Sequence, residues 1–163
     1  MSGTRPELVA FAVGVLSLVL ILGALGFQYI GGYPPCEICH WQRWPHIAAA
    51  VVGILGGGAV SVGMLQPKLA WPIAVLTILL AAVSGAIGVY HAGIEWQWWK
   101  GPTACTGPAF QLMGKLNLNA HVVMCDHAAW RMFGLSMAGY NAIISLGAAA
   151  IGLFLVRRAE KTA

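Results

Sequence analysis

The sequence predicts an all-α integral membrane protein, built as a four-helix bundle with two outer loops. The first observation is composition. Of the 163 residues, 59% are hydrophobic and only 9% are charged, whereas an ordinary soluble domain has roughly 25% charged residues. The second is a set of four apolar stretches, each about the length of the 20 residues that a helix needs to cross the hydrocarbon core. These stretches contain no Asp, Glu, Lys or Arg and span 8–30, 45–65, 69–90 and 133–156.

The four stretches are predicted to be helices because they lack the alternation of a transmembrane strand. The first, 8–30, is too long for the core of a signal peptide, so we keep it as a span. The link at 66–68 is short, which makes the second and third helices antiparallel neighbours. In the second outer loop, residues 110–123 read as a short amphipathic helix on the membrane surface. We take residues 1–163 as a single membrane domain.

The positions of Lys and Arg predict the orientation of the bundle, since cytoplasmic loops are enriched in these residues. One side holds five cations close to the helix ends, namely Arg5, Lys68, Arg157, Arg158 and Lys161. The other side holds four, diluted over the outer loops at 31–44 and 91–132, namely Arg43, Lys100, Lys115 and Arg131. Both termini are therefore expected in the cytoplasm. The nine cations form no basic stripe, so we expect no binding to nucleic acid.

All four cysteines lie in the predicted outer loops, on the side where an exported compartment permits disulfides. Cys36 and Cys39 form a C-x-x-C motif in the first loop, and Cys105 and Cys125 flank the amphipathic segment in the second. Of the three possible pairings, local closure favours Cys36–Cys39 and leaves Cys105–Cys125. A ring as small as C-x-x-C constrains little chain, so this pair favours redox chemistry over a structural staple. For the wider pair taken alone, a structural staple is the favoured role, because such staples are common in secreted loops.

Two metal-centred alternatives use the same motif. Zinc could take Cys36, Cys39 and His40, with a fourth ligand from a more distant histidine: His46, His91, His121 or His127. Covalent haem requires C-x-x-C-H, and residues 36–40 match that string. Haem would leave Cys105 and Cys125 unexplained. For zinc, the second pair lacks close ligand spacing, and an oxidising compartment competes for the thiols. A redox pair is the favoured interpretation.

Arg43 follows the motif at the start of the second predicted helix, where Trp44-Pro45 opens the apolar run. The helix dipole and the guanidinium would both stabilise a thiolate on Cys39. They would also stabilise negative charge on a reduced, carbonyl-bearing ring held nearby. The alternative is an arginine that only anchors the helix at the headgroups.

Residues 35–43, Pro-Cys-Glu-Ile-Cys-His-Trp-Gln-Arg, resemble the P-C-x-x-C-x-x-x-R segment of the DsbB-type, quinone-dependent disulfide-bond-formation proteins. Cys125-Asp126, and Trp130 through Met137, are similar to that family's entry into its fourth helix. The resemblance covers nearly the whole chain: four spans, two outer loops and one cysteine pair in each loop. It implies an enzyme of the bacterial inner membrane with its cysteines in the periplasm.

The resemblance also implies a direction of electron flow. A reduced, thioredoxin-fold carrier of the DsbA type would attack Cys105, with Cys125 helping to resolve the mixed disulfide. Cys125 would then attack Cys36, and Cys39 would become the thiolate that faces a membrane quinone, either ubiquinone or menaquinone. Arg43 would hold the quinone and stabilise that thiolate. His91, at the outer end of the third helix, resembles a histidine that the family places near its quinone, unless it is an interfacial residue without a role.

Physical reasoning supports two separate pairs, because a soluble carrier needs an exposed pair whereas quinone needs one at the membrane edge. The vitamin K epoxide reductase type is a neighbouring alternative, but a C-x-x-C between the first two spans and the following arginine favour the DsbB type. A non-enzymatic protein of four spans, with stapled outer loops, is the alternative from another class. The absence of charged residues from the predicted spans counts against a transporter.

Overall fold

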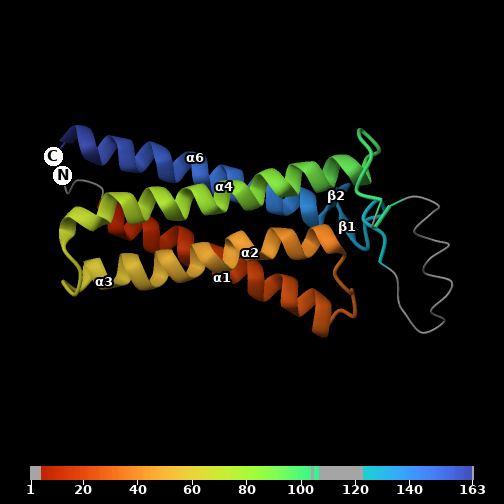
Figure 1. Ribbon diagram of the computed structural model, residues 1–163, viewed down its shortest axis with the longest axis horizontal. Coiled ribbons are helices and arrows are strands. Elements are labelled where there is room, and N and C mark those ends of the chain that lie inside the picture. The colour runs from red at the N-terminus through yellow and green to blue at the C-terminus, as the bar shows by residue number, and fades with distance from the viewer. Residues whose placement is uncertain (1–4, 104, 107–122, 163) are drawn as a thin grey trace.

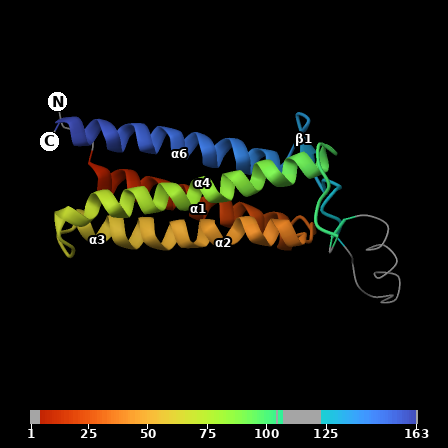
Figure 2. The ribbon, with the colours of Figure 1, turned by 45° about the horizontal axis from the view of Figure 1, so that its top comes forward.

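The computed structural model describes residues 5–103, 105–106 and 123–162. Four long helical segments run side by side in two different views (Figures 1 and 2), and each is long and apolar enough to span a membrane. The first and fourth are single helices, the third begins with a 3-10 turn (Pro67–Leu69), and the second is built from three consecutive pieces. In chain order the segments are α1 (Pro6–Tyr29), α2 (Glu37–Val51) with a π-helical turn (Val52–Gly57) and α3 (Gly58–Ser61), α4 (Ala70–Glu95), and α6 (Met137–Thr162). The predicted all-α membrane bundle is confirmed.

The second span begins eight residues earlier than predicted, at Glu37 rather than at Pro45. The sequence interpretation placed Pro45 in the first turn, where proline is favoured, but Pro45 lies inside α2. The helix begins earlier because Cys36 is its N-cap: the sulfur accepts a hydrogen bond from the Cys39 backbone N–H at 3.2 Å. The C-x-x-C motif therefore occupies the first turn of a helix and not an outer loop.

The second span contains a π-helical turn where it meets α1. A Cβ atom placed on Gly53 would lie 2.5 Å from the Ala10 carbonyl oxygen and 2.8 Å from the Gly14 Cα. At Gly57 the corresponding atom would lie 2.7 Å from the Glu7 carbonyl oxygen. Backbone meets backbone here, so only glycine fits, as the Gly53/Gly57 spacing indicates.

The third and fourth spans also differ from their predicted bounds at the end that carries the cysteines. Helix α4 continues to Glu95 and so includes His91. Helix α6 begins at Met137, four residues later than predicted, because a small hairpin precedes it. In this hairpin β1 (Arg131–Met132) pairs antiparallel with β2 (Leu135–Ser136). Phe133 and Gly134 have positive φ, as a two-residue hairpin turn requires and as a helix does not allow.

The two ends of the bundle differ. Helix α1 begins and α6 ends at one end, whereas the N-terminal end of α2, the C-terminal end of α4 and the hairpin lie at the other (Figure 1). The predicted amphipathic helix, apart from Val123, lies outside the described residues. An apolar core of small and branched side chains joins α1, α4 and α6, formed by Val9, Ala10, Val13, Ala74, Ile78, Ala81, Ala149 and Val156. A second buried cluster lies at the end with the hairpin.

Candidate redox site

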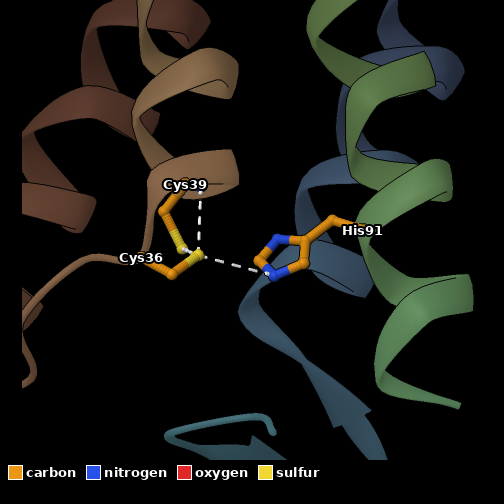
Figure 3. A group of neighbouring side chains, drawn as sticks. All are labelled: Cys36, Cys39 and His91. Atoms are coloured by element: carbon orange, nitrogen blue, oxygen red, sulfur yellow. Dashed lines mark hydrogen bonds between the residues drawn. The ribbon is translucent and has the colours of Figure 1, made fainter. Parts of the chain in front are cut away.

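Cys36 and Cys39 face each other at the N-terminus of α2. Positions three apart on a helix point to one side, and the two sulfur atoms lie 2.6 Å apart, both as free thiols (Figure 3). Cys36 is buried and Cys39 is half-buried. The pair is therefore in contact and needs only a short movement to close a disulfide, whose sulfurs are about 2.05 Å apart.

Cys105 and Cys125 form a disulfide. Both are buried in the second apolar cluster, which also contains Cys36, Ile38 and Ile94. The two cysteine pairs thus share one cluster, although they are far apart in sequence. This burial differs from the expectation of an exposed pair: 2% of Cys105 and none of Cys125 is accessible. A soluble partner can reach the disulfide only if the residues that cover it move.

Two features of the structure favour Cys36 as the protonated member of the thiol pair. Its side-chain hydrogen bond with Cys39 and its burial raise the pKa of the Cys36 thiol far above the ordinary value. Raising the pH through the ordinary range of a thiol, around 8.5, therefore leaves Cys36 protonated. Because the thiolate is the nucleophile, Cys36 is the less reactive sulfur of the resting, reduced pair.

We expect iodoacetamide to modify Cys39 before Cys36 in the reduced protein, because Cys36 is both protonated and buried. Mass spectrometry of peptides after short exposures at pH values between about 7 and 9 measures the order, across the ordinary thiol pKa. Cys36 should stay the slower site throughout this range. Equal rates at the two sulfurs would contradict the assignment of the proton.

His91 connects the thiol pair to its surroundings. Its Nε2 lies 3.6 Å from the Cys36 sulfur (Figure 3) and 3.7 Å from Oε1 of Glu95, one turn further along α4. The ring also hydrogen-bonds the backbone of Cys125, and its Nδ1 lies 2.9 Å from the Gln42 amide nitrogen. His91 therefore contacts both cysteine pairs.

A cavity of about 410 Å³ opens beside the thiols. Cys39 and Arg43 line it from α2, and His91 and Glu95 line it from α4. The Arg43 guanidinium is held by a 2.7 Å hydrogen bond to the side-chain oxygen of Gln28 on α1. Much of the remaining wall is apolar, including Ile21, Phe27, Met137 and Ile144. A carbonyl-bearing ring fits this combination of apolar walls and one fixed cation.

The sequence interpretation missed Glu95 and Asn141, gave Gln42 no role of its own and considered His46 only as a zinc ligand, whereas all four residues line the cavity. Glu95 places a second ionisable side chain, besides Arg43, in the wall of the cavity. The signals were present in the sequence, since Glu95 is four residues after His91, and Asn141 is an amide within an apolar span. The partners of these residues could not be deduced without the packing of the helices.

The site also offers ligands for a metal ion. Ligand atoms of Cys36, Cys39 and His91 all lie within 4.8 Å of one another, and Glu95 is next to His91. Within the described ranges His40 is not a member of this group, and His121 lies outside them. Zinc takes such a ligand set. A bound zinc would hold both thiols, so metal binding and disulfide exchange exclude each other here.

Fold and site together define a class: a membrane protein of four spanning helices that carries a thiol pair packed against a disulfide. The family model described as "Disulfide bond formation protein DsbB" matches residues 6–155. The chain therefore belongs to the DsbB family of disulfide bond formation proteins, and its role is that of a disulfide oxidoreductase in a multi-pass membrane protein.

Three proteins named for this role show how far the similarity extends. A disulfide bond formation protein B of Polaromonas sp. (strain JS666) is 25% identical, covering 94% of this chain and 92% of its own length. One from Xylella fastidiosa is 28% identical, covering 93% and 87%. Disulfide bond formation protein B 2 of Pseudomonas aeruginosa is 26% identical, covering 80% and 78%.

Proposed function

We propose that the protein reoxidises a periplasmic, thioredoxin-fold dithiol carrier of the DsbA type and passes the electrons through its two cysteine pairs to a membrane quinone. One observation carries the proposal. A thiol pair and a disulfide share a buried cluster, and the thiols line an apolar cavity that also contains a fixed arginine. Such an arrangement suits a relay between a protein dithiol and an apolar oxidant dissolved in the bilayer.

The first exchange reduces the second pair. A carrier thiolate attacks the Cys105 sulfur and forms a mixed disulfide, and the Cys105–Cys125 bond breaks so that Cys125 leaves as a thiolate. The second carrier thiol then displaces Cys105 and leaves the carrier oxidised. Two electrons have moved from the carrier to the Cys105/Cys125 pair.

The second exchange passes these electrons to the first pair. The Cys125 thiolate attacks Cys36 of an oxidised Cys36–Cys39 pair, and Cys39 leaves as a thiolate. Cys105 then attacks Cys125, which restores the Cys105–Cys125 disulfide and frees Cys36. Both pairs lie in one cluster, so no large displacement separates the sulfurs. The reduced Cys36/Cys39 pair is the resting thiol pair described above.

The final step oxidises the Cys36/Cys39 pair. A bound quinone supplies the oxidising capacity, because it accepts two electrons and two protons. Cys39 lines the cavity and would be the electron donor, and Arg43, which also lines it, would hold a quinone and stabilise the negative charge that forms on its reduction. On oxidation, the two thiols would give up two protons and two electrons as the Cys36–Cys39 bond forms, and these are what a quinone accepts.

The proposed location is the bacterial inner membrane, with both termini in the cytoplasm and the cysteines in the periplasm. Helices α1 and α6 begin and end, respectively, at the end of the bundle opposite the thiol pair (Figure 1). The excess of cations near that end favours the cytoplasm for it.

The decisive experiment measures quinone reduction by the purified protein in detergent. Ubiquinone and menaquinone analogues are each supplied with a reduced thioredoxin-fold protein, and the absorbance of the quinone is followed. We expect a decrease in oxidised quinone that depends on both the protein and the carrier. If neither quinone is reduced by a protein whose Cys36 and Cys39 titrate as thiols, the proposal is wrong.

Arg43→Ala is expected to raise the KM for quinone by about 10-fold to 100-fold, because it removes a charged hydrogen-bond donor of the kind worth about 1.5–3 kcal/mol. Steady-state kinetics at varied quinone concentration measure the change. Gln28→Ala is the matched variant: it keeps the guanidinium but removes its 2.7 Å partner, so its effect should be smaller. Unchanged KM in Arg43→Ala would remove this residue from the quinone site.

The burial of Cys105 and Cys125 favours a second candidate role for that pair, a structural staple. The double variant Cys105→Ala/Cys125→Ala separates the two roles. If the pair acts as a relay, the variant should lose quinone reduction driven by the carrier. It should keep the reduction driven by dithiothreitol, which can reduce Cys36–Cys39 directly. Unimpaired reduction with the carrier would assign the pair to the staple.

A further inference from the structure

A chain of hydrogen bonds runs from the thiol pair into the membrane-spanning part of the bundle. His91 on α4 contacts Gln42 on α2, with 2.9 Å between His91 Nδ1 and Gln42 Nε2. The Gln42 side-chain oxygen lies 2.7 Å from the amide nitrogen of Asn141 on α6. His91 and Gln42 are buried, and Asn141 is half-buried. Three helices are thus joined through three side chains.

The direction of each hydrogen bond in this chain follows from acceptors that cannot act as donors. The Asn141 amide nitrogen lies 3.2 Å from the backbone carbonyl oxygen of Ser84. A carbonyl only accepts, so the NH₂ group of Asn141 must be the one that faces α4. The same NH₂ group meets Gln42, which must therefore present its oxygen to Asn141.

This orientation of Gln42 leaves its NH₂ group facing His91. The Ile38 backbone carbonyl oxygen lies 3.5 Å from Gln42 Nε2. A carbonyl oxygen only accepts, so this contact supports the same orientation of the Gln42 side chain. His91 Nδ1 must then accept the hydrogen bond, so the proton of the neutral ring is on Nε2. The groups near Nε2 are the Cys36 sulfur at 3.6 Å and the Glu95 carboxylate at 3.7 Å.

We infer that Asn141 is a positioning residue for the redox pair: through Gln42 it fixes His91 as the Nε2–H tautomer, which presents an N–H to the Cys36 sulfur. The effect on turnover rests on the proposed function. In that scheme, negative charge forms on the Cys36 sulfur at two points: when Cys36 leaves Cys125, and when it gives up its proton before bonding to Cys39. An N–H aimed at the sulfur stabilises this charge. The other tautomer would offer a lone pair instead.

The side-chain oxygen of Asn141 also has hydrogen-bond partners, which hold the amide in place. Its oxygen accepts from His46 Nε2 at 2.8 Å and from the Ser145 hydroxyl at 2.9 Å. These bonds support the same orientation, because both partners can donate. Ser145→Ala removes one of them and keeps the contacts of the NH₂ group with Ser84 and Gln42. It is therefore the matched control for changes at Asn141.

The tautomer can be measured directly in the wild-type protein. Nitrogen-15 NMR of histidine-labelled protein in detergent distinguishes a ring nitrogen that carries a proton from one that does not, and His91→Phe identifies the signals of His91. We expect the proton on Nε2. A proton on Nδ1 would overturn the inference. The measurement needs neither quinone nor carrier, so its failure is separate from failure of the proposed function.

Asn141→Asp should reverse the direction of the hydrogen bonds from residue 141 through Gln42 to His91, because a carboxylate cannot donate to Gln42. Gln42 is then expected to turn its oxygen towards His91 and move the proton to Nδ1, and carrier-driven quinone reduction should fall about tenfold or more. Ser145→Ala should change neither the tautomer nor the rate. A proton that stays on Nε2 in Asn141→Asp, or a moved proton with an unchanged rate, would contradict the positioning role.

A second variant guards against a failure of Asn141→Asp to fold. Gln42→Glu places an acceptor directly against His91 Nδ1, and it should move the proton there without any change at Asn141. The intact Cys105–Cys125 disulfide and a single peak in size-exclusion chromatography verify the fold of each variant. If Gln42→Glu folds and keeps the proton on Nε2, the link between Gln42 and His91 is refuted.

Discussion

Cys39→Ser is expected to reduce quinone at no more than the uncatalysed rate, while the helical bundle remains intact. Cys39 is the sulfur of the first pair that is only half-buried, and it lines the cavity together with Arg43. A serine hydroxyl in its place can neither form a disulfide with Cys36 nor donate electrons. Its size is similar to that of the thiol, and the N-cap belongs to Cys36, so the start of α2 should survive.

Quinone absorbance with a reduced carrier measures the loss, and circular dichroism verifies the helix content. His40→Asn is the control, because His40 is the next residue, is exposed and does not line the cavity. It should keep wild-type activity, which would also count against a haem or zinc site that uses His40. Quinone reduction that survives in Cys39→Ser would refute the proposed relay.

Gly53→Val is expected to have the largest effect on stability. The added Cβ would meet the Ala10 carbonyl oxygen at 2.5 Å, the Gly14 Cα at 2.8 Å and the Thr77 Cγ2 at 2.9 Å. Two of these three atoms belong to the α1 backbone and cannot move aside alone. The helices must separate, and we expect a loss of about 3 kcal/mol or more in the free energy of unfolding.

The measurement is unfolding of the detergent-solubilised protein by titration with a denaturing detergent, followed by circular dichroism. Gly147→Val is the control, because Gly147 is also within a spanning helix but has no atom within 4 Å of its Cβ position. It should unfold near the wild-type midpoint. Similar losses in both variants would show that valine itself, and not the contact with α1, is responsible.

The four spans could be predicted because length and hydropathy act locally along the chain. The start of the second span could not, because Pro45 resembles a first-turn proline and a cysteine is an unusual N-cap. The extension of α4 to Glu95 was missed for a related reason: His91 and Glu95 interrupt the apolar run but are buried against the cysteine cluster. Rules based on local hydropathy end a helix at such polar residues, whereas in the fold the end of the helix is determined by tertiary contacts.

The candidate site also has a part that the sequence predicts and a part that only the packing of the helices reveals. Cys36, Cys39 and Arg43 follow one another in a recognisable motif, so the sequence alone singles them out. The contact between Gln42 and Asn141 joins residues 99 positions apart, and no pattern in a single sequence indicates which polar residues of two helices will meet. The contact of His91 with Cys36 likewise depends on how α4 packs against α2.

The π-helical turn at Val52–Gly57 has a consequence for the phase of the second span. A π turn holds one more residue than an α turn, and each residue of a helix turns the chain by about 100°. The half that carries Cys39 and Gln42 is therefore rotated relative to the half beyond the turn, away from the alignment of an unbroken α-helix. Gly57 can face α1 while the thiols face the cavity. Deleting one residue from this turn would restore a regular helix and make the two surfaces compete for one orientation.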